Sequence, residues 1–233
     1  MRVLSIISLL LVCLSGCTTV STNPRPDNYY SAMMSDPAAE TGSLFSGDSA
    51  VLSDADIAKI LDYRYEAPEL GRVAIMTVGG DRWSQWSEEM AVATERMRSE
   101  VIDKLEGSPR VYDASFLPSV LVPEKQTVPH LREAAARYQA DLLLIYRSYC
   151  RSFEKYRLFS ADRSKAYCGV EAVLLDARTG LVPYTSLSTR AFTALETKED
   201  TNFRETVMKA QLNAVTDALG EVSDGVVGFL ASE

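Results

Sequence analysis

The 233-residue chain contains one histidine, His130, and four cysteines, two of which fall within the first 17 residues. Histidine and cysteine are common ligands of zinc and other transition metals, so their scarcity argues against a metal site and limits acid–base chemistry. Basic residues are outnumbered, with 24 Lys and Arg against 32 Asp and Glu and a formal net charge of −8. This charge disfavours nucleic acid and broad contact with anionic lipid headgroups. We expect no metal, no cofactor and no nucleic-acid partner, and we interpret His130 as a surface residue.

Long apolar runs are also scarce. Arg2 precedes one such run, residues 3–14, whereas a helix needs about 20 residues to cross a bilayer. A positive start, a short apolar core and then the small residues Ser15 and Gly16 are typical of a secretory signal. No later run reaches spanning length, so the sequence predicts export rather than a transmembrane segment.

Residues 14–17, Leu-Ser-Gly-Cys, resemble the lipobox of bacterial lipoproteins, whose signal peptidase cuts before the cysteine. The resemblance implies a signal peptide over 1–16 and a mature chain anchored by two or three acyl chains on Cys17. Several chains anchor stably, because each buried methylene contributes about 0.8 kcal/mol. Thr18 stands where family members retained in the inner membrane typically carry aspartate. This favours the outer membrane of a Gram-negative bacterium, with the protein facing the periplasm. The alternative is an ordinary cleavable signal with a chance cysteine.

The rest of the chain divides into three parts. Residues 17–52 contain scattered Pro, Ser, Asn and Gly without sustained periodicity, as in a flexible tether. Ser53 and Asp56 have the spacing of a capping box, which predicts a short helix to about residue 63 within a helix-and-linker segment, 53–71. Residues 72–233 form the expected periplasmic domain.

Within that domain the hydrophobic patterns predict a strand–helix–strand–helix–strand–strand–strand–helix order. This indicates an α/β (α+β) fold in which helices pack against a mixed sheet. The expected strands are 73–78, 111–112, 141–154, 165–176 and 181–193, and the expected helices are 84–106, 127–139 and a long one from about 203. Thr127 is expected to cap the second helix. Residues 176–180 read as a hairpin turn in which Gly180 takes a positive φ.

Cys150 and Cys168 lie in consecutive predicted strands. If they face each other in an antiparallel pair, apolar residues meet apolar residues and Arg147 meets Glu171. A register that satisfies both faces in this way is seldom random. Because the periplasm is oxidising, we predict a structural disulfide. Two free thiols and a metal site are the alternatives, and no second cysteine pair or histidine cluster supports a metal site.

Two tryptophans, Trp83 and Trp86, flank a turn that follows the first strand of the domain. They are candidates for a partner-binding spot, although a lid over the core would use them equally well. The turn at Gly79 and Gly80 lacks the motifs of phosphate-binding loops, so we interpret it as a plain turn. A groove near residues 79–86 would instead suit a small molecule or glycan.

Three segments together resemble the periplasmic module shared by the curli secretion channel family and the N-terminal domain of the Tol β-propeller protein. They are the opening strand from residue 72 with its helix, the AAARYQADLLLIY stretch at 134–146, and the Asp-x-x-Thr-Gly hairpin at 176–180. The resemblance implies a non-enzymatic envelope module that binds protein partners or itself and can form a ring. The hairpin around 153–165 is too charged to face lipid cheaply, so we predict no channel. An enzyme would instead require two acids close together in a cleft.

Overall fold

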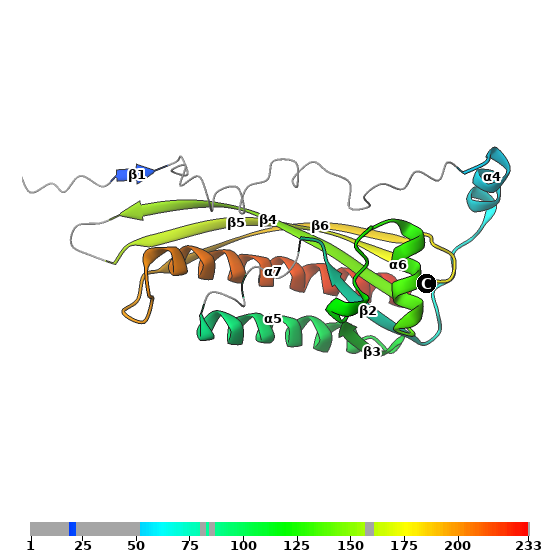
Figure 1. Ribbon diagram of the computed structural model, residues 1–233, viewed down its shortest axis with the longest axis horizontal. Coiled ribbons are helices and arrows are strands. Elements are labelled where there is room, and N and C mark those ends of the chain that lie inside the picture. Colours follow the sequence, from blue (N-terminus) through cyan, green and yellow to red (C-terminus); the bar gives the residue numbers. More distant parts are fainter. Residues whose placement is uncertain (1–18, 22–51, 80–82, 84–86, 157–160, 233) are drawn as a thin grey trace, which may run out of the picture.

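The computed structural model describes residues 19–21, 52–79, 83, 87–156 and 161–232 (Figure 1). From β2 onward the predicted order of strands and helices is confirmed, and the fold is a mixed sheet with packed helices. The elements are β1 (Thr19–Ser21), α4 (Asp54–Asp62), β2 (Gly71–Thr77), α5 (Glu88–Glu106), β3 (Val111–Phe116), the 3-10 turn η2 (Ser119–Leu121), α6 (Val128–Arg137), β4 (Leu142–Tyr156), β5 (Arg163–Asp176), β6 (Tyr184–Leu195) and α7 (Phe203–Ser232).

The main sheet has the strand order β3-β2-β4-β5-β6. Strand β2 runs parallel to β3 and β4, whereas β4, β5 and β6 are antiparallel. Parallel neighbours require a crossover, and α5 and α6 supply the two that are needed. Antiparallel neighbours need only hairpins, which is why the three strands follow one another directly. The predicted register is confirmed, with Cys150 opposite Cys168 and Arg147 opposite Glu171.

The two faces of the sheet are covered differently (Figure 1). Helices α5 and α7 lie together along one face, where side chains such as Leu144, Cys168 and Val170 are buried. On the opposite face, α6 covers only the end of the sheet around Leu143 and Ile145. The remainder, made of the odd-numbered residues 147–155, 163–171 and 185–195, is called the open face below. Most of these residues are exposed or partly exposed.

The helix boundaries differ slightly from those predicted. Helix α5 begins at Glu88 rather than near residue 84, because the Ser87 hydroxyl accepts a hydrogen bond from the Met90 amide and caps it. Helix α6 begins after Thr127, but the Thr127 hydroxyl pairs with Nδ1 of His130 at 2.6 Å rather than with a backbone N–H. Thr127 is therefore the N-cap residue, as predicted, but its side chain caps no backbone N–H. His130 itself is exposed.

The predicted tether is not entirely without structure. Strand β1 pairs antiparallel with the last residues of β4, with Thr19 opposite Tyr156 and Ser21 opposite Glu154. The linker also contacts the domain, because the Tyr65 ring stacks on Phe229. In the described residues, no helix combines the length and the apolar character needed to span a membrane.

Helix α7 offers a matched pair of glycines as a test of its packing. A Cβ on Gly225 would overlap Oη of Tyr184, whose ring stacks on Phe229 at 5.3 Å, whereas a Cβ on Gly228 would meet nothing within 4 Å. Glycine inside a helix costs roughly 0.5–1 kcal/mol relative to alanine. We therefore expect Gly228→Ala to raise the free energy of unfolding by about that amount, and Gly225→Ala to lower it by about 1–3 kcal/mol. Urea unfolding of both variants measures this, and equal stabilisation by the two would show that Tyr184 does not pack on α7.

Candidate functional site

The predicted site residues fall into three groups. Cys17 and Trp86 lie outside the described residues, so the lipid anchor and half of the tryptophan pair stay predictions. Trp83 is half-buried and packs against the core beneath α5 and α7. This placement suits a lid over the core, and a docking role for Trp83 also stays a prediction. The two remaining cysteines come together.

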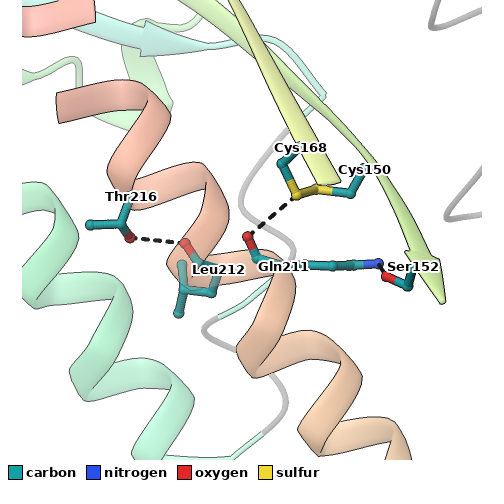
Figure 2. Close-up of a disulfide and its surroundings, with 6 residues drawn as sticks. All are labelled: Cys150, Ser152, Cys168, Gln211, Leu212 and Thr216. Atoms are coloured by element: carbon teal, nitrogen blue, oxygen red, sulfur yellow. Dashed lines mark hydrogen bonds between the residues drawn. A yellow bond between two sulfur atoms is a disulfide. The ribbon is translucent and has the colours of Figure 1, made fainter. Parts of the chain in front are cut away.

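Cys150 and Cys168 form a disulfide between β4 and β5, with their Cα atoms 4.2 Å apart (Figure 2). Such a short separation is typical of an antiparallel pair without mutual backbone hydrogen bonds, where side chains approach closely. Cys168 is fully buried, and its Sγ lies 3.5 Å from the backbone oxygen of Gln211 in α7. Helix α7 therefore covers the disulfide. The disulfide has a structural role, since it links β4 to β5 beneath this helix.

The same part of α7 is fixed to β4 by a side-chain hydrogen bond. Gln211 is buried, and its Nε2 donates to Oγ of Ser152 at 2.8 Å (Figure 2). Ser152 lies two residues beyond Cys150 on the same side of the strand. A buried amide needs such a partner, because an unpaired one costs about 1–3 kcal/mol. Gln211 thus connects α7 both to the disulfide and to β4 at this end of the sheet.

A partly buried charged network joins the start of α5, the loop before α7 and the first turns of α7. We call it the Lys209 cluster, and its members are Ser87, Glu89, Asp200, Glu205, Thr206 and Lys209. The ammonium of Lys209 donates to Oδ1 of Asp200 at 2.5 Å and to Oε2 of Glu89 at 2.6 Å. Glu205 accepts from the Ser87 hydroxyl at 2.7 Å and from the Thr201 amide at 2.8 Å. The network thus ties α5 to α7 where both helices begin.

The electrostatics of the cluster favour the charged forms of its members. Burial alone would raise the pKa of Asp200, but hydrogen bonds from Lys209, Thr206 and the Thr197 amide, with the Lys209 charge, lower it overall. The Ser87 hydroxyl and the Thr201 amide lower the pKa of Glu205 despite its burial. Burial would lower the pKa of Lys209, but its bonds to Asp200 and Glu89 raise it.

The cluster is the part of the described chain that most resembles a metal or acid–base site. Oxygens of Glu89, Asp200 and Glu205 lie within 4.8 Å of one another. However, the Lys209 ammonium already supplies the cation to two of these carboxylates. The pKa values of Asp200 and Glu205 are lowered. A carboxyl group that acts as a general acid needs a raised pKa instead. The arrangement is therefore that of a structural ion network.

Sequence reasoning missed this cluster because no local signal marks it. Glu89 and Lys209 lie 120 positions apart, and each resembles an ordinary charged residue on the solvated side of an amphipathic helix. Only the capping serine gives a hint, since Ser87 stands two positions before Glu89 at the start of an amphipathic helix. Its second role, as a donor to Glu205, depends on tertiary packing.

The Asp-x-x-Thr-Gly segment forms a tight turn between β5 and β6. Oδ1 of Asp176 accepts from the amide of Thr179 at 2.6 Å and from its hydroxyl at 2.8 Å. Gly180 has a φ of 79°, so the prediction that it takes a positive φ is confirmed. Glycine adopts this conformation without the steric penalty of a side chain. The aspartate is thus used to close the turn.

Helix α4 differs from the other helices because none of its residues is buried. Its N-cap is as predicted, with the Asp56 amide donating to Oγ of Ser53 at 3.2 Å. Ile57, Ile60 and Leu61 form an apolar row at helical spacing, and they are 42%, 40% and 73% exposed. Figure 1 places α4 at the opposite end of the molecule from β1.

These features define an α+β domain whose sheet contains a disulfide and whose helices α5 and α7 are joined by a partly buried ion network. A short helix, α4, exposes a row of apolar side chains. No protein-family model matches the chain, and no curated protein matches it. Among solved structures, it is similar to the hypothetical protein CT253 from Chlamydia trachomatis, with 13% identity over 70% of this chain and 99% of that one and a TM-score of 0.41.

Two further solved structures are a PelC dodecamer from Paraburkholderia phytofirmans and the lipoprotein GNA1162 from Neisseria meningitidis. The PelC chain is 14% identical over 67% of this chain and 90% of that one, with a TM-score of 0.35. The Neisseria chain is 14% identical over 69% of this chain and 99% of that one, with a TM-score of 0.29. At these TM-scores the similarities assign no function, and the resemblance to the curli and Tol modules stays a prediction.

Proposed function

We propose that this protein is a lipoprotein of the bacterial envelope, anchored in the outer membrane through acyl chains on Cys17. Its domain faces the periplasm, binds protein partners and catalyses no reaction. Self-association is one form that this binding can take. The anchor rests on the Leu-Ser-Gly-Cys motif at 14–17, and the binding role rests on α4.

The observation that carries the binding role is the exposed apolar row of α4. A nine-residue helix is shorter than the roughly 12–15 residues at which an isolated helix becomes even marginally stable in water. In proteins most helical stability comes from burying an apolar face, and the row of Ile57, Ile60 and Leu61 is exposed. An amphipathic helix of this kind fits a hydrophobic groove on another protein. Figure 1 places α4 at the opposite end of the molecule from β1, which follows the proposed anchor in the sequence. A protein partner would therefore have access to α4.

Site-specific photo-crosslinking in intact cells tests this proposal. A photoreactive residue replaces Leu61, in the apolar row, and in a matched variant it replaces Lys59, which projects from another side of α4 with 79% of its side chain exposed. We expect Leu61 to yield either one dominant envelope-protein adduct or a ladder of self-adducts, identified by mass spectrometry. Lys59 should yield the same adducts in much lower amount.

The result also separates the two parts of the proposal. Cys17→Ala should release the protein from the membrane fraction, which tests the anchor alone. If the wild-type chain is present and anchored, yet Leu61 gives no more adduct than Lys59, then α4 is not a binding element and the assembly role is wrong.

A further inference from the structure

The open face of the sheet carries a concentration of basic and aromatic side chains at the end of β4 and the start of β5. We call it the basic–aromatic block, and its members are Arg151, Phe153, Lys155, Arg163, Lys165 and Tyr167. Strand pairing places Arg151 opposite Tyr167, Phe153 opposite Lys165, and Lys155 opposite Arg163. The six residues therefore form one contiguous patch, two strands wide.

The patch is built as a surface rather than as part of the core. The rings of Phe153 and Tyr167 meet edge to face with centroids 5.7 Å apart, and they are 40% and 42% exposed. The ammonium of Lys165 lies 4.7 Å from the centre of the Tyr167 ring. On the neighbouring strand, Leu195 is opposite Arg163 and is 58% exposed. Aromatic rings and basic groups thus share one solvent-facing surface.

The charge of this surface is opposite to that of the whole chain, which is −8. Among the described residues of β4, β5 and β6, Glu171 is the only carboxylate on the open face, and it pairs with Arg147 at 2.8 Å. Glu154 belongs to the other face by the alternation of the strand. Lys155 and Arg163 stand directly opposite each other, an arrangement of like charges that is destabilising by itself. An anionic partner would relieve this repulsion.

Strand β1 relates the block to the lipid anchor. Thr19, the first residue of β1, pairs with Tyr156 at the end of β4, so β1 begins at the end of the sheet that carries the block. Thr19 stands only two positions after Cys17, and two residues span at most about 7 Å. If Cys17 is acylated, the block is held next to the membrane surface.

We propose that the open face at this end of the sheet docks on the membrane, with the block in contact with anionic lipid headgroups. This inference rests on the proposed anchor at Cys17. Lys and Arg are attracted to anionic headgroups, and Tyr and other aromatic rings are favoured at the level of the headgroups. The acidic remainder of the chain is repelled from the same surface, so the domain docks in one orientation. The anchor keeps the local concentration of the membrane high, which lets a small patch suffice.

Thiol accessibility on the anchored, full-length mature protein tests the proposal. Thr193 is exposed on the open face opposite Lys165, and Val92 is 56% exposed on α5 on the other side of the domain. In Thr193→Cys and Val92→Cys, the introduced thiol is the only free one once Cys17 is acylated and the disulfide is formed. Each variant is reconstituted in phosphatidylcholine vesicles or in equimolar phosphatidylcholine–phosphatidylglycerol vesicles. A bulky water-soluble maleimide then measures the labelling rate.

We expect labelling of Thr193→Cys to be at least about fivefold slower in the anionic vesicles, which is the effect of a single basic residue at such a surface. Labelling of Val92→Cys should be unchanged. High salt should restore the Thr193→Cys rate, because it shortens the Debye length from about 8 Å at 0.15 M to about 3 Å at 1 M. Adding Lys155→Gln, Arg163→Gln and Lys165→Gln together should do the same.

Equal labelling of Thr193→Cys in the two kinds of vesicle would overturn the proposal. Protection that rises with protein density at constant lipid composition would also overturn it, because a second copy would then cover the face. A chain that does not float with the vesicles, or that carries an unmodified Cys17 by mass spectrometry, would instead refute the anchor. Failure of the docking and failure of the proposed function are thus distinguishable.

Discussion

Asp200→Asn is expected to lower the free energy of unfolding by about 3 kcal/mol, because it breaks a buried ion pair and leaves the Lys209 ammonium with only the exposed Glu89 carboxylate. The Asp200 side chain is fully buried, and its oxygens accept hydrogen bonds from Lys209 at 2.5 Å, from the Thr206 hydroxyl at 2.6 Å and from the Thr197 amide at 3.1 Å. Asparagine retains one acceptor oxygen and turns an NH₂ group toward these donors. Urea unfolding at neutral pH measures the loss.

Glu89→Gln is the matched control, since Glu89 binds the same Lys209 ammonium at 2.6 Å but is 60% exposed. Solvent-exposed ion pairs contribute about 0–1 kcal/mol, so this variant should lose less than about 1 kcal/mol. If the two substitutions cost the same, burial does not determine the strength of this network, and the structural role assigned to Asp200 is wrong.

The same cluster predicts an acid limb in the stability profile. The pKa values of Asp200 and Glu205 are lowered from their ordinary values of 3.8 and 4.5. A carboxyl group with a depressed pKa in the folded state stabilises the protein above its unfolded pKa and loses that stabilisation as the pH falls through the folded value. The wild type should therefore lose stability below about pH 4 more steeply than Asp200→Asn does. Parallel slopes would exclude Asp200 as a source of the acid limb.

Local sequence patterns predicted the features that depend on neighbouring residues or on strand alternation. The Ser53 cap of α4 and the positive φ of Gly180 each follow from the conformation that one residue type favours. The β4–β5 register could be predicted because one face of the strand pair is apolar and the other is largely polar. A shift of β5 by one residue would turn Glu171 toward the core and expose the β5 residues now buried there.

Features that arise from tertiary packing were not predicted. The Lys209 cluster needs α5 and α7 side by side, and nothing in either helix specifies that Lys209 reaches Glu89. Strand β1 has three residues and no periodicity, so only the free edge of β4 determines where it pairs. The contact between Tyr184 and Gly225 also depends on tertiary packing, because the two residues belong to β6 and α7.

The open face was within reach of sequence reasoning but was not resolved by it. The total charge of the hairpin around 153–165 argues against a membrane-spanning strand. Separating its residues by strand alternation shows that Lys155 and Arg163 share a face with Phe153, whereas Glu154 lies on the other. Charged groups that cannot enter the hydrocarbon are well placed among headgroups. The same residues that argue against a channel therefore support the proposed docking surface.

Reduction of the Cys150–Cys168 disulfide is expected to lower the free energy of unfolding by about 3 kcal/mol. The bridge closes a loop with a sequence separation of 18, and in the chain-entropy model a loop of this size restricts the unfolded chain by about that amount. This loss is a large fraction of the roughly 5–15 kcal/mol that stabilises a typical domain. Urea unfolding of the wild type with and without reductant measures it, because reduction leaves the side-chain volume of both residues in place.

A double variant, Cys150→Ala with Cys168→Ala, is the matched control, and reductant should not change its stability. The extent of alkylation decides between the disulfide and two free thiols. In the unreduced, urea-unfolded wild type, iodoacetamide should modify neither residue, whereas two adducts should appear after reduction. Two adducts without reductant would show that the thiols are free. In that case reductant should also leave the free energy of unfolding unchanged. This end of the sheet would then be held beneath α7 by the pairing of β4 with β5 and not by a covalent bond.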